Sequence, residues 1–143
     1  MTTAFGQIAG ALKTLFEAAP AVSNQVYRAR IKSIEANHND AVVIRLQGGV
    51  PERFAILNAP MDWETEIAIE CYARSRALTA DEAVDALLAK VWAKLTADTS
   101  LGGLVMDLNI TNLDYDFAGE AEHMACVTVT LRVLHRTQNH SLE

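Results

Sequence analysis

The residues of this chain whose types could do chemistry are mostly carboxylates. Asp107, Asp114 and Asp116 follow one another closely, and Glu120 and Glu122 come soon after them. Side chains two apart on a strand point to the same side, and carboxylate oxygens are the ligands that hard divalent cations prefer. We favour a solvated acidic edge at this cluster. The alternatives are a small enzyme with a metal site around the three aspartates, or a glycosidase-type carboxylate pair.

Other catalytic and metal-binding patterns are missing from the sequence. It has no Gly-x-Ser-x-Gly, no Gly-rich phosphate loop and no His-Glu-x-x-His. No histidine has another His or Cys at metal-ligand spacing. Structural or solvent-exposed roles are therefore expected for all four: His38, His123, His135 and His140. The sequence predicts no catalytic residue, no metal site and no cofactor, and so a protein that is not an enzyme.

The cysteines are Cys71 and Cys126. Strand alternation places Cys71 on the apolar side of its strand and Cys126 on the polar side of its own. A disulfide requires Cβ atoms about 4 Å apart and directed at one another. Two free thiols are therefore expected.

Length and charge limit the classes of protein. The chain has 143 residues, about one domain, with a net charge of −6 and 50% hydrophobic residues. The acidic balance argues against non-specific binding to nucleic acid, and no sequence-specific nucleic-acid partner is expected. No apolar run approaches the length of a membrane span, and the N-terminus lacks the pattern of a secretory signal. A cytoplasmic product without a membrane partner is expected.

A helix from Thr79 to about Thr96 is the element around which the rest is arranged. Thr79 and Glu82 match the capping box that begins a helix. A helix with many apolar residues along one face requires a sheet to pack on. The residues that follow the cap recur with the spacing of one helix face: Val84, Leu87, Leu88, Val91, Trp92 and Leu95.

Strands with period-2 alternation lie on both sides of this helix. Residues 62–74 precede it, and residues 106–111 and 126–133 follow it. The two later strands are separated by the polar segment 118–122, which predicts an antiparallel hairpin. The strand 64–74 and the strand directly after the helix are expected to be parallel neighbours through a right-handed crossover.

The N-terminal half begins with a helix predicted over residues 3–18, capped by Thr2 or Thr3 and ended by Pro20. We favour packing of this helix on the same sheet; the alternative is an amphipathic helix that binds a partner. Residues 25–31 alternate as a strand, with Tyr27, Ala29 and Ile31 on the dry side and Arg28 and Arg30 on the wet side.

Residues 35–60 form the loop-rich part of the predicted fold. A short strand at 41–46 is expected to end at 47–51, where Gly48, Gly49 and Pro51 interrupt it, and to pair back with a strand at 53–57. Loops of this kind often carry partner contacts.

These elements predict an α/β fold of the α+β type. A mixed, mainly antiparallel sheet would carry both helices on one face, as a two-layer sandwich. Residues 1–137 are expected to form a single domain and residues 138–143 a disordered tail. The other face of the sheet would be polar, with the side chains of Glu64, Glu66, Glu70, Thr128, Thr130 and Arg132.

The order of elements and a few turn residues resemble a known family. They are the run Leu101-Gly102-Gly103-Leu104-Val105, the acidic-aromatic stretch 113–117 and the closing strand 125–133. Together they look like the C-terminal half of phage tail terminator proteins, the minor tail protein U type of long-tailed phages and prophages. The resemblance extends from about Trp63 to Arg136 and, more loosely, over the N-terminal helix.

The resemblance implies a small mixed α/β subunit of a hexameric ring. Such a ring caps the growing tail tube, ends its polymerisation and offers a surface for joining the head. The implied partners are the chain itself, the major tail tube protein and a head-completion protein, in the virion tail and, during assembly, in the host bacterial cytoplasm. A Mg²⁺ dependence of assembly is left open. The alternatives are another small adaptor, such as a head-completion or tail-chaperone protein, and the metal-dependent enzyme above.

For a ring of like subunits, the sequence predicts contact through the polar sheet face and the loop-rich segment. A head-to-tail ring needs two different patches that fit each other, and an acidic strand and an arginine-bearing strand would supply them. The other interpretation is that these charges solvate a monomer. The predicted interface residues are Arg28, Arg30, Glu64, Glu66, Glu70, Tyr72 and Arg132.

Overall fold

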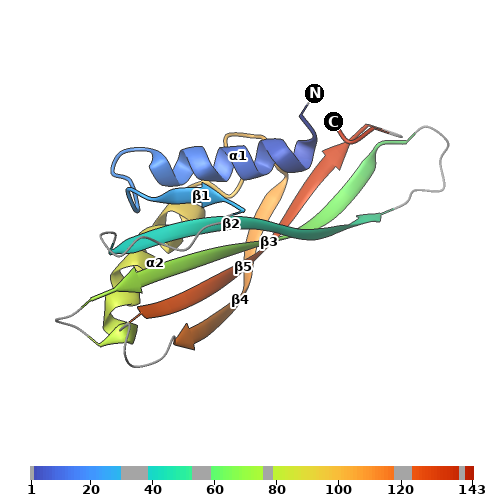
Figure 1. Cartoon of the computed structure of the whole chain (residues 1–143). Coiled ribbons are helices and arrows are strands. Elements are labelled where there is room, and N and C mark those ends of the chain that lie inside the picture. Colours follow the sequence, from blue (N-terminus) through green and yellow to red (C-terminus); the bar gives the residue numbers. More distant parts are fainter. Residues whose placement is uncertain (1, 30–38, 53–58, 76–78, 118–123, 139–140) are drawn as a thin grey trace.

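A computed structural model describes residues 2–29, 39–52, 59–75, 79–117, 124–138 and 141–143. In these ranges two helices cover one face of an open, five-stranded mixed sheet, which confirms the predicted α+β class. The side with the helices is termed the helix face and the other side the open face. The elements are α1 (Ala4–Glu17), β1 (Val26–Arg28), β2 (Asp40–Glu52), β3 (Met61–Arg74), α2 (Ala80–Ala97), β4 (Asp107–Phe117) and β5 (Met124–Thr137) (Figure 1).

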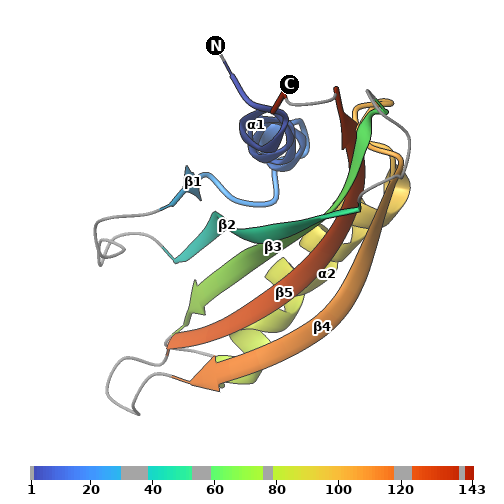
Figure 2. The same ribbon diagram turned by 90° about the vertical axis from the view of Figure 1, so that its right-hand side faces the viewer.

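The strands lie in the order β1-β2-β3-β5-β4 (Figure 2). β1 is parallel to β2, and the other neighbours are antiparallel, including the predicted β4–β5 hairpin. The prediction that β3 and β4 are parallel neighbours is wrong, because β5 lies between them. The core-facing side chains of β5 are buried from Ala125 to Val133, whereas Leu113 and Tyr115 of β4 stay exposed. Burial of apolar area therefore favours β5 in the centre.

α1 forms where the sequence predicted it. The Oγ1 atom of Thr3 accepts a hydrogen bond from the Gly6 amide at 3.2 Å and caps the helix. Ile8, Leu12 and Phe16 recur on one face and are buried in the core. α1 lies over β1 and β2, on the side of the sheet that α2 also covers (Figure 2).

α2 also matches its prediction. A carboxylate oxygen of Glu82 accepts a hydrogen bond from the Thr79 amide at 3.1 Å, as the capping box requires. Lys94 donates to the carbonyl of Ala18 at 3.0 Å, which ties α2 to the end of α1. Trp92 lies at the rim of the apolar stripe and is 44% exposed, while the centre of the stripe is buried at Val84, Leu87, Val91 and Leu95.

β2 is longer than predicted. Residues 47–51, expected to interrupt the strand, pair with β3 after a register shift between Leu46 and Gly48. An ideal Cβ at Gly49 would lie 3.3 Å from ring atoms of both Phe5 and Trp63, so this glycine lets α1 approach the sheet. Pro51 is tolerated because this half of β2 is a sheet edge. The predicted strand at 53–57 lies outside the described residues.

β1 is shorter than predicted, and its side chains face the sides of the sheet opposite to those predicted. Ala29 has φ 47°, which ends the strand. The register pairs Arg28 with the core residue Ile44, and the Arg28 guanidinium lies along α1 beside Gly6 and Gly10. Arg28 is therefore on the helix face, and its predicted place on the open face is wrong. A three-residue strand takes its orientation from its partner strand, because its own alternation is too short to decide.

The turn after α2 is left-handed. Leu101, Gly102 and Gly103 have φ values of 49°, 70° and 89°, a conformation that glycine adopts without strain. The Asp98 carboxylate accepts hydrogen bonds from the amides of Ser100 at 2.9 Å and Gly102 at 2.8 Å. The stop predicted from the two glycines is thus a defined turn, held by Asp98, that leads into β4.

The described part of the C-terminal tail, residues 138 and 141–143, folds back on the chain. The Ala4 amide, at the start of α1, donates to the Leu142 carbonyl at 2.7 Å, and the Gln138 amide donates to the carbonyl of Glu143 at 3.2 Å. Neither helix in the described ranges combines the length and hydropathy needed to cross a membrane.

Candidate functional site

The open face carries ion pairs that join neighbouring strands. Arg45 on β2 lies 2.6 Å from Glu70 on β3, and Tyr72 donates a hydrogen bond to the same carboxylate at 2.7 Å. The hydrogen bond and charge of Glu70 raise the pKa of Arg45. Two residues of the predicted interface, Glu70 and Tyr72, are therefore engaged within the subunit.

Two more pairs join β3 to β5. Arg136 binds Asp62 through two contacts, Nε to Oδ1 at 2.7 Å and Nη2 to Oδ2 at 3.2 Å. The hydrogen bond from Arg136 lowers the pKa of Asp62. Arg132 and Glu64 approach to 4.0 Å and both stay more than half exposed. Arginines on both neighbouring strands thus balance carboxylates of β3.

The structure brings together most of the predicted interface residues. Strand register places Glu64, Glu66, Glu70, Tyr72 and Arg132 on the open face. Of these, Glu66 is exposed and has no ion-pair partner within the described ranges. Arg28 lies on the helix face, and Arg30 lies outside the described residues.

A groove runs along residues 47–50 of β2. It has a volume of about 410 Å³. Gly48 contributes to this space, since an added Cβ there would meet nothing within 4 Å. Its lining residues are Gln47, Gly48, Gly49, Val50, Glu64, Thr65, Glu66 and Arg132.

Sequence reasoning missed Arg45, Asp62 and Arg136, which make the shortest pairs on this face. Alternation along residues 41–46 already places Arg45 on the polar side of its strand. Its partner, however, depends on the β2–β3 register, which aligns Arg45 with Ala68 beside Glu70. That register cannot be read from either strand alone.

The three aspartates of the acidic cluster do not lie together. Asp114 and Asp116 share the open face, as predicted, opposite Thr128 and Cys126. Asp107 is seven residues before Asp114 on the same extended strand, a separation of roughly 20 Å. Glu120 and Glu122 lie outside the described residues. Among the residues that are described, no group of three His, Cys, Asp or Glu could hold a metal ion.

His135 is buried beneath the start of α1, which confirms a structural role for it. Its Nε2 atom lies 2.7 Å from the Oγ1 atom of Thr65, and its Nδ1 atom has no hydrogen-bond partner among the described residues. The Phe5 ring meets the rings of Trp63 and His135 edge to face, each with centroids 5.0 Å apart. Burial lowers the pKa of His135 and keeps the imidazole neutral.

Both cysteines are free, as predicted. Cys71 is fully buried on the helix face, and burial raises the pKa of its thiol to about 12. Burial also raises the pKa of Cys126, which is partly exposed on the opposite face. A raised thiol pKa disfavours the reactive thiolate, so the local chemistry suits packing.

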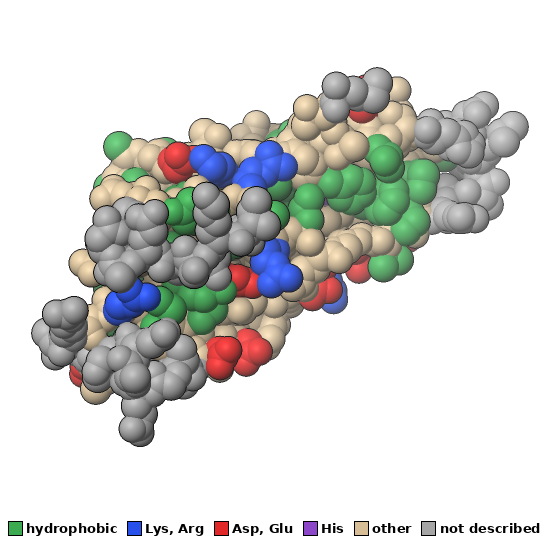
Figure 3. Space-filling model, viewed as in Figure 1, with side chains coloured by type: hydrophobic (Ala, Val, Ile, Leu, Met, Phe, Trp, Pro, Cys, Tyr) green, Lys and Arg blue, Asp and Glu red, His purple; other side chains and the backbone are tan. Residues whose placement is uncertain are grey.

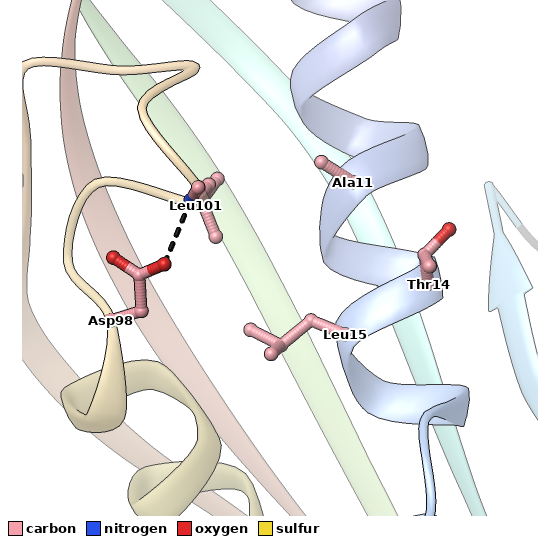
Figure 4. A pocket seen from close by; sticks show the side chains of 6 residues that line it. Ala11, Thr14, Leu15, Asp98 and Leu101 are labelled. Carbon is pink, nitrogen blue, oxygen red and sulfur yellow. Dashed lines mark hydrogen bonds between the residues drawn. The ribbon is translucent and has the colours of Figure 1, made fainter.

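A second hollow lies between α1 and the turn after α2, with a volume of about 320 Å³. Ala11, Thr14 and Leu15 of α1 face Leu101 and Asp98 across it (Figure 4). The hydrogen bond from the Gly102 amide to Asp98 occupies the polar side of this hollow. Its wall is otherwise mainly apolar, which suits packing better than chemistry.

No family model and no curated protein matches this sequence. Among solved structures, the chain is similar to one in the virion of a native gene transfer agent (GTA) particle. The similarity has a TM-score of 0.49 and 12% sequence identity, and covers 91% of this chain and 95% of that one. So distant a likeness decides neither the fold nor the function.

Proposed function

We propose that this chain is a structural assembly protein of a phage or prophage tail. It caps the tail tube, ends its polymerisation and helps to join the tail to the head. The observation that carries the proposal is the resemblance of the Leu101–Val105 turn, the 113–117 stretch and the 125–133 strand to tail terminators. In this chain those segments are the turn after α2, the second half of β4 and most of β5.

The shape of the subunit supports this proposal. Helices cover one face of the sheet, and the open face keeps charged side chains on β2, β3 and β5. A subunit with a pattern of charges on its second face suits assembly into a head-to-tail ring, for which we propose six copies. The partners would be further copies of the chain, the major tail tube protein and a head-completion protein.

Charge gives the ring a further property. The chain has a net charge of −6, and an acidic lumen would not bind DNA phosphates, so a duplex could slide through it.

The open-face residues Glu64, Glu66 and Arg132 would set the register between subunits, because exposed charges of this kind fix partner choice more than they add affinity.

The test is tube capping with purified components. Tail tubes polymerised from the major tail tube protein are mixed with the chain, with and without Mg²⁺, and tube lengths and ends are measured by negative-stain electron microscopy. Tubes that stop growing and carry one ring at an end support the proposal. Unchanged growth at a saturating concentration of the chain contradicts it. Binding only to a head-completion protein would instead favour another head-tail adaptor.

A further inference from the structure

Both edges of the sheet are long and open within the described ranges. β4 pairs with β5 on one side only, over its 11 residues. At the other edge, β1 pairs with residues 42–44 of β2, so residues 46–52 pair with β3 alone. Unpaired backbone N–H and C=O groups along such edges form a template for another strand.

Exposed hydrophobic side chains gather at these two edges. Leu46 and Val50, on the free half of β2, are 45% and 70% exposed, and hydrophobic side chains are gathered there in Figure 3. Leu113 and Tyr115, on β4, are 39% and 46% exposed. β4 lacks Lys, Arg and Pro and carries its charge as aspartates, while the free half of β2 has its proline and charge at its end, in Pro51 and Glu52.

The helix face of β4 is buried at Leu108 in its first half and exposed at Leu113 and Tyr115 in its second half. The helix packs against β3 and β5, and its Lys94 holds α1 on one side. Trp92 projects from the opposite side, toward β4, and is 44% exposed. Register places Leu113 and Tyr115 on this face as well, opposite Val129 and Val127. The edge of β4 therefore combines an open backbone with apolar side chains.

Strand direction decides how two copies would meet. Three antiparallel steps separate β2 from β4, so the two edge strands run in opposite directions. If copies of the subunit are related by rotation about an axis parallel to the strands, every copy keeps the same strand directions. β4 of one copy then meets β2 of the next as an antiparallel pair. Pairing of β4 with another β4 in the register centred on Tyr115 would instead place Asp114 opposite Asp116 of the other copy, and like charges at such positions are destabilising.

We propose that β4 of one copy adds to residues 46–52 of β2 in a second copy, so that the sheet continues from subunit to subunit. The groove along Gly48 and Gly49 then lies beside the incoming strand. On the open face, Arg45 of the acceptor strand is paired with Glu70 but is still 56% exposed, and it offers Asp114 and Asp116 of the incoming strand a cation. The proposal rests on the ring of the proposed function and identifies its contact surface.

The experiment uses the full chain with one edge altered at a time. The donor variant carries Leu113→Lys and Tyr115→Lys, and the acceptor variant carries Leu46→Lys and Val50→Lys. Leu142→Lys is the matched control, since Leu142 is 50% exposed but lies in the tail. Circular dichroism and melting temperature establish that each variant folds. If the donor variant does not fold, Tyr115→Lys alone replaces it, and if the acceptor variant does not fold, Val50→Lys alone replaces it.

Sedimentation over a range of concentrations should place the assembly midpoint of each edge variant at least about tenfold higher than that of wild type, with the control unchanged. An equimolar mixture of the two variants should form a one-to-one heterodimer in native mass spectrometry, because each retains the edge that the other has lost. Normal assembly of either edge variant, absence of the heterodimer, or a wild type that stays monomeric overturns the inference.

The same samples separate this inference from the proposed function. Wild type that assembles through these edges but leaves tail tubes growing supports the edge pairing and contradicts the capping role. Wild type that caps tubes while both edge variants cap equally well supports the role and overturns the edge pairing.

Discussion

At the scale of single residues, His135 couples the fold to pH. Its imidazole is buried against Phe5 and bonded to Thr65, and burial lowers its pKa in the folded protein. As pH falls below about 6.5, the unfolded chain takes up the proton first. The stability that neutral His135 contributes is therefore present above that pH and is lost as pH falls through the folded-state pKa.

Urea unfolding at pH 8 to 5 measures this effect. Wild type should lose stability below about pH 6.5, while His135→Gln, which has no titrating ring, should be less stable at pH 8 but show a flatter pH dependence in this range. Asp62, with its lowered pKa, titrates at much lower pH and does not interfere. Equal pH slopes in the two proteins would exclude His135 as the source.

Two adjacent glycines on β2 should respond differently to alanine. At Gly49 an added Cβ would lie 3.1 Å from Oγ1 of Thr65 and 3.3 Å from rings of Phe5 and Trp63. Thr65 is held by its hydrogen bond to His135, and the two rings are held by their edge-to-face packing. Gly49→Ala should therefore lower the free energy of unfolding by about 1–3 kcal/mol. Gly48→Ala, with nothing within 4 Å, should change it by less than about 0.5 kcal/mol. Denaturation at low protein concentration gives both values, and equal effects would contradict the packing argument.

At the scale of elements, different contacts hold the start of α1 and the end of α2. α1 is capped by Thr3 and tied to the tail through Ala4. α2 passes into a left-handed turn held by Asp98. Glycine has opposite consequences in these two places, because a helix interior disfavours it and a left-handed turn requires it.

Gly10→Ala should stabilise the protein by about 0.5–1 kcal/mol, since Gly10 is inside α1 and an added Cβ would make one ordinary contact, 3.8 Å from Arg28. Gly103→Ala should destabilise it by about 1–2 kcal/mol, because φ there is 89°. Thermal unfolding measures both. A loss of stability in Gly10→Ala, or none in Gly103→Ala, would contradict this assignment of the two sites.

At the scale of the whole molecule, the open-face carboxylates divide into two groups. Glu70 is bonded to Arg45 and Tyr72 within the subunit and is only 12% exposed in its side chain, whereas Glu66 is exposed beside the groove. Glu70→Gln should therefore lower the melting temperature of the monomer. Glu66→Lys should leave the melting temperature unchanged and weaken self-association, more at low salt than at high salt.

Scanning fluorimetry and light scattering, at two salt concentrations, separate these two effects. A drop in melting temperature for Glu66→Lys, with assembly intact, would show that the open face serves only the monomer. Glu66→Gln is the matched control for removal of charge without reversal.

Local sequence determined the type of nearly every element. The capping residues and apolar spacing of α1 and α2, the alternation of β3 and β5, and the two free thiols depend on neighbours a few residues away, so periodicity was sufficient. The same alternation placed the acidic side chains of β3 on the open face of the candidate site.

Only the tertiary structure decided the rest. β5 lies between β3 and β4 because its whole core-facing side is buried, and that burial depends on both neighbouring strands. β2 continues through Gly48 and Gly49 because both pair with β3, and Gly49 leaves room for Phe5 of α1. Arg28 points toward α1 because β2 sets the orientation of β1. Such contacts join residues distant in sequence, and no local period of the sequence encodes them.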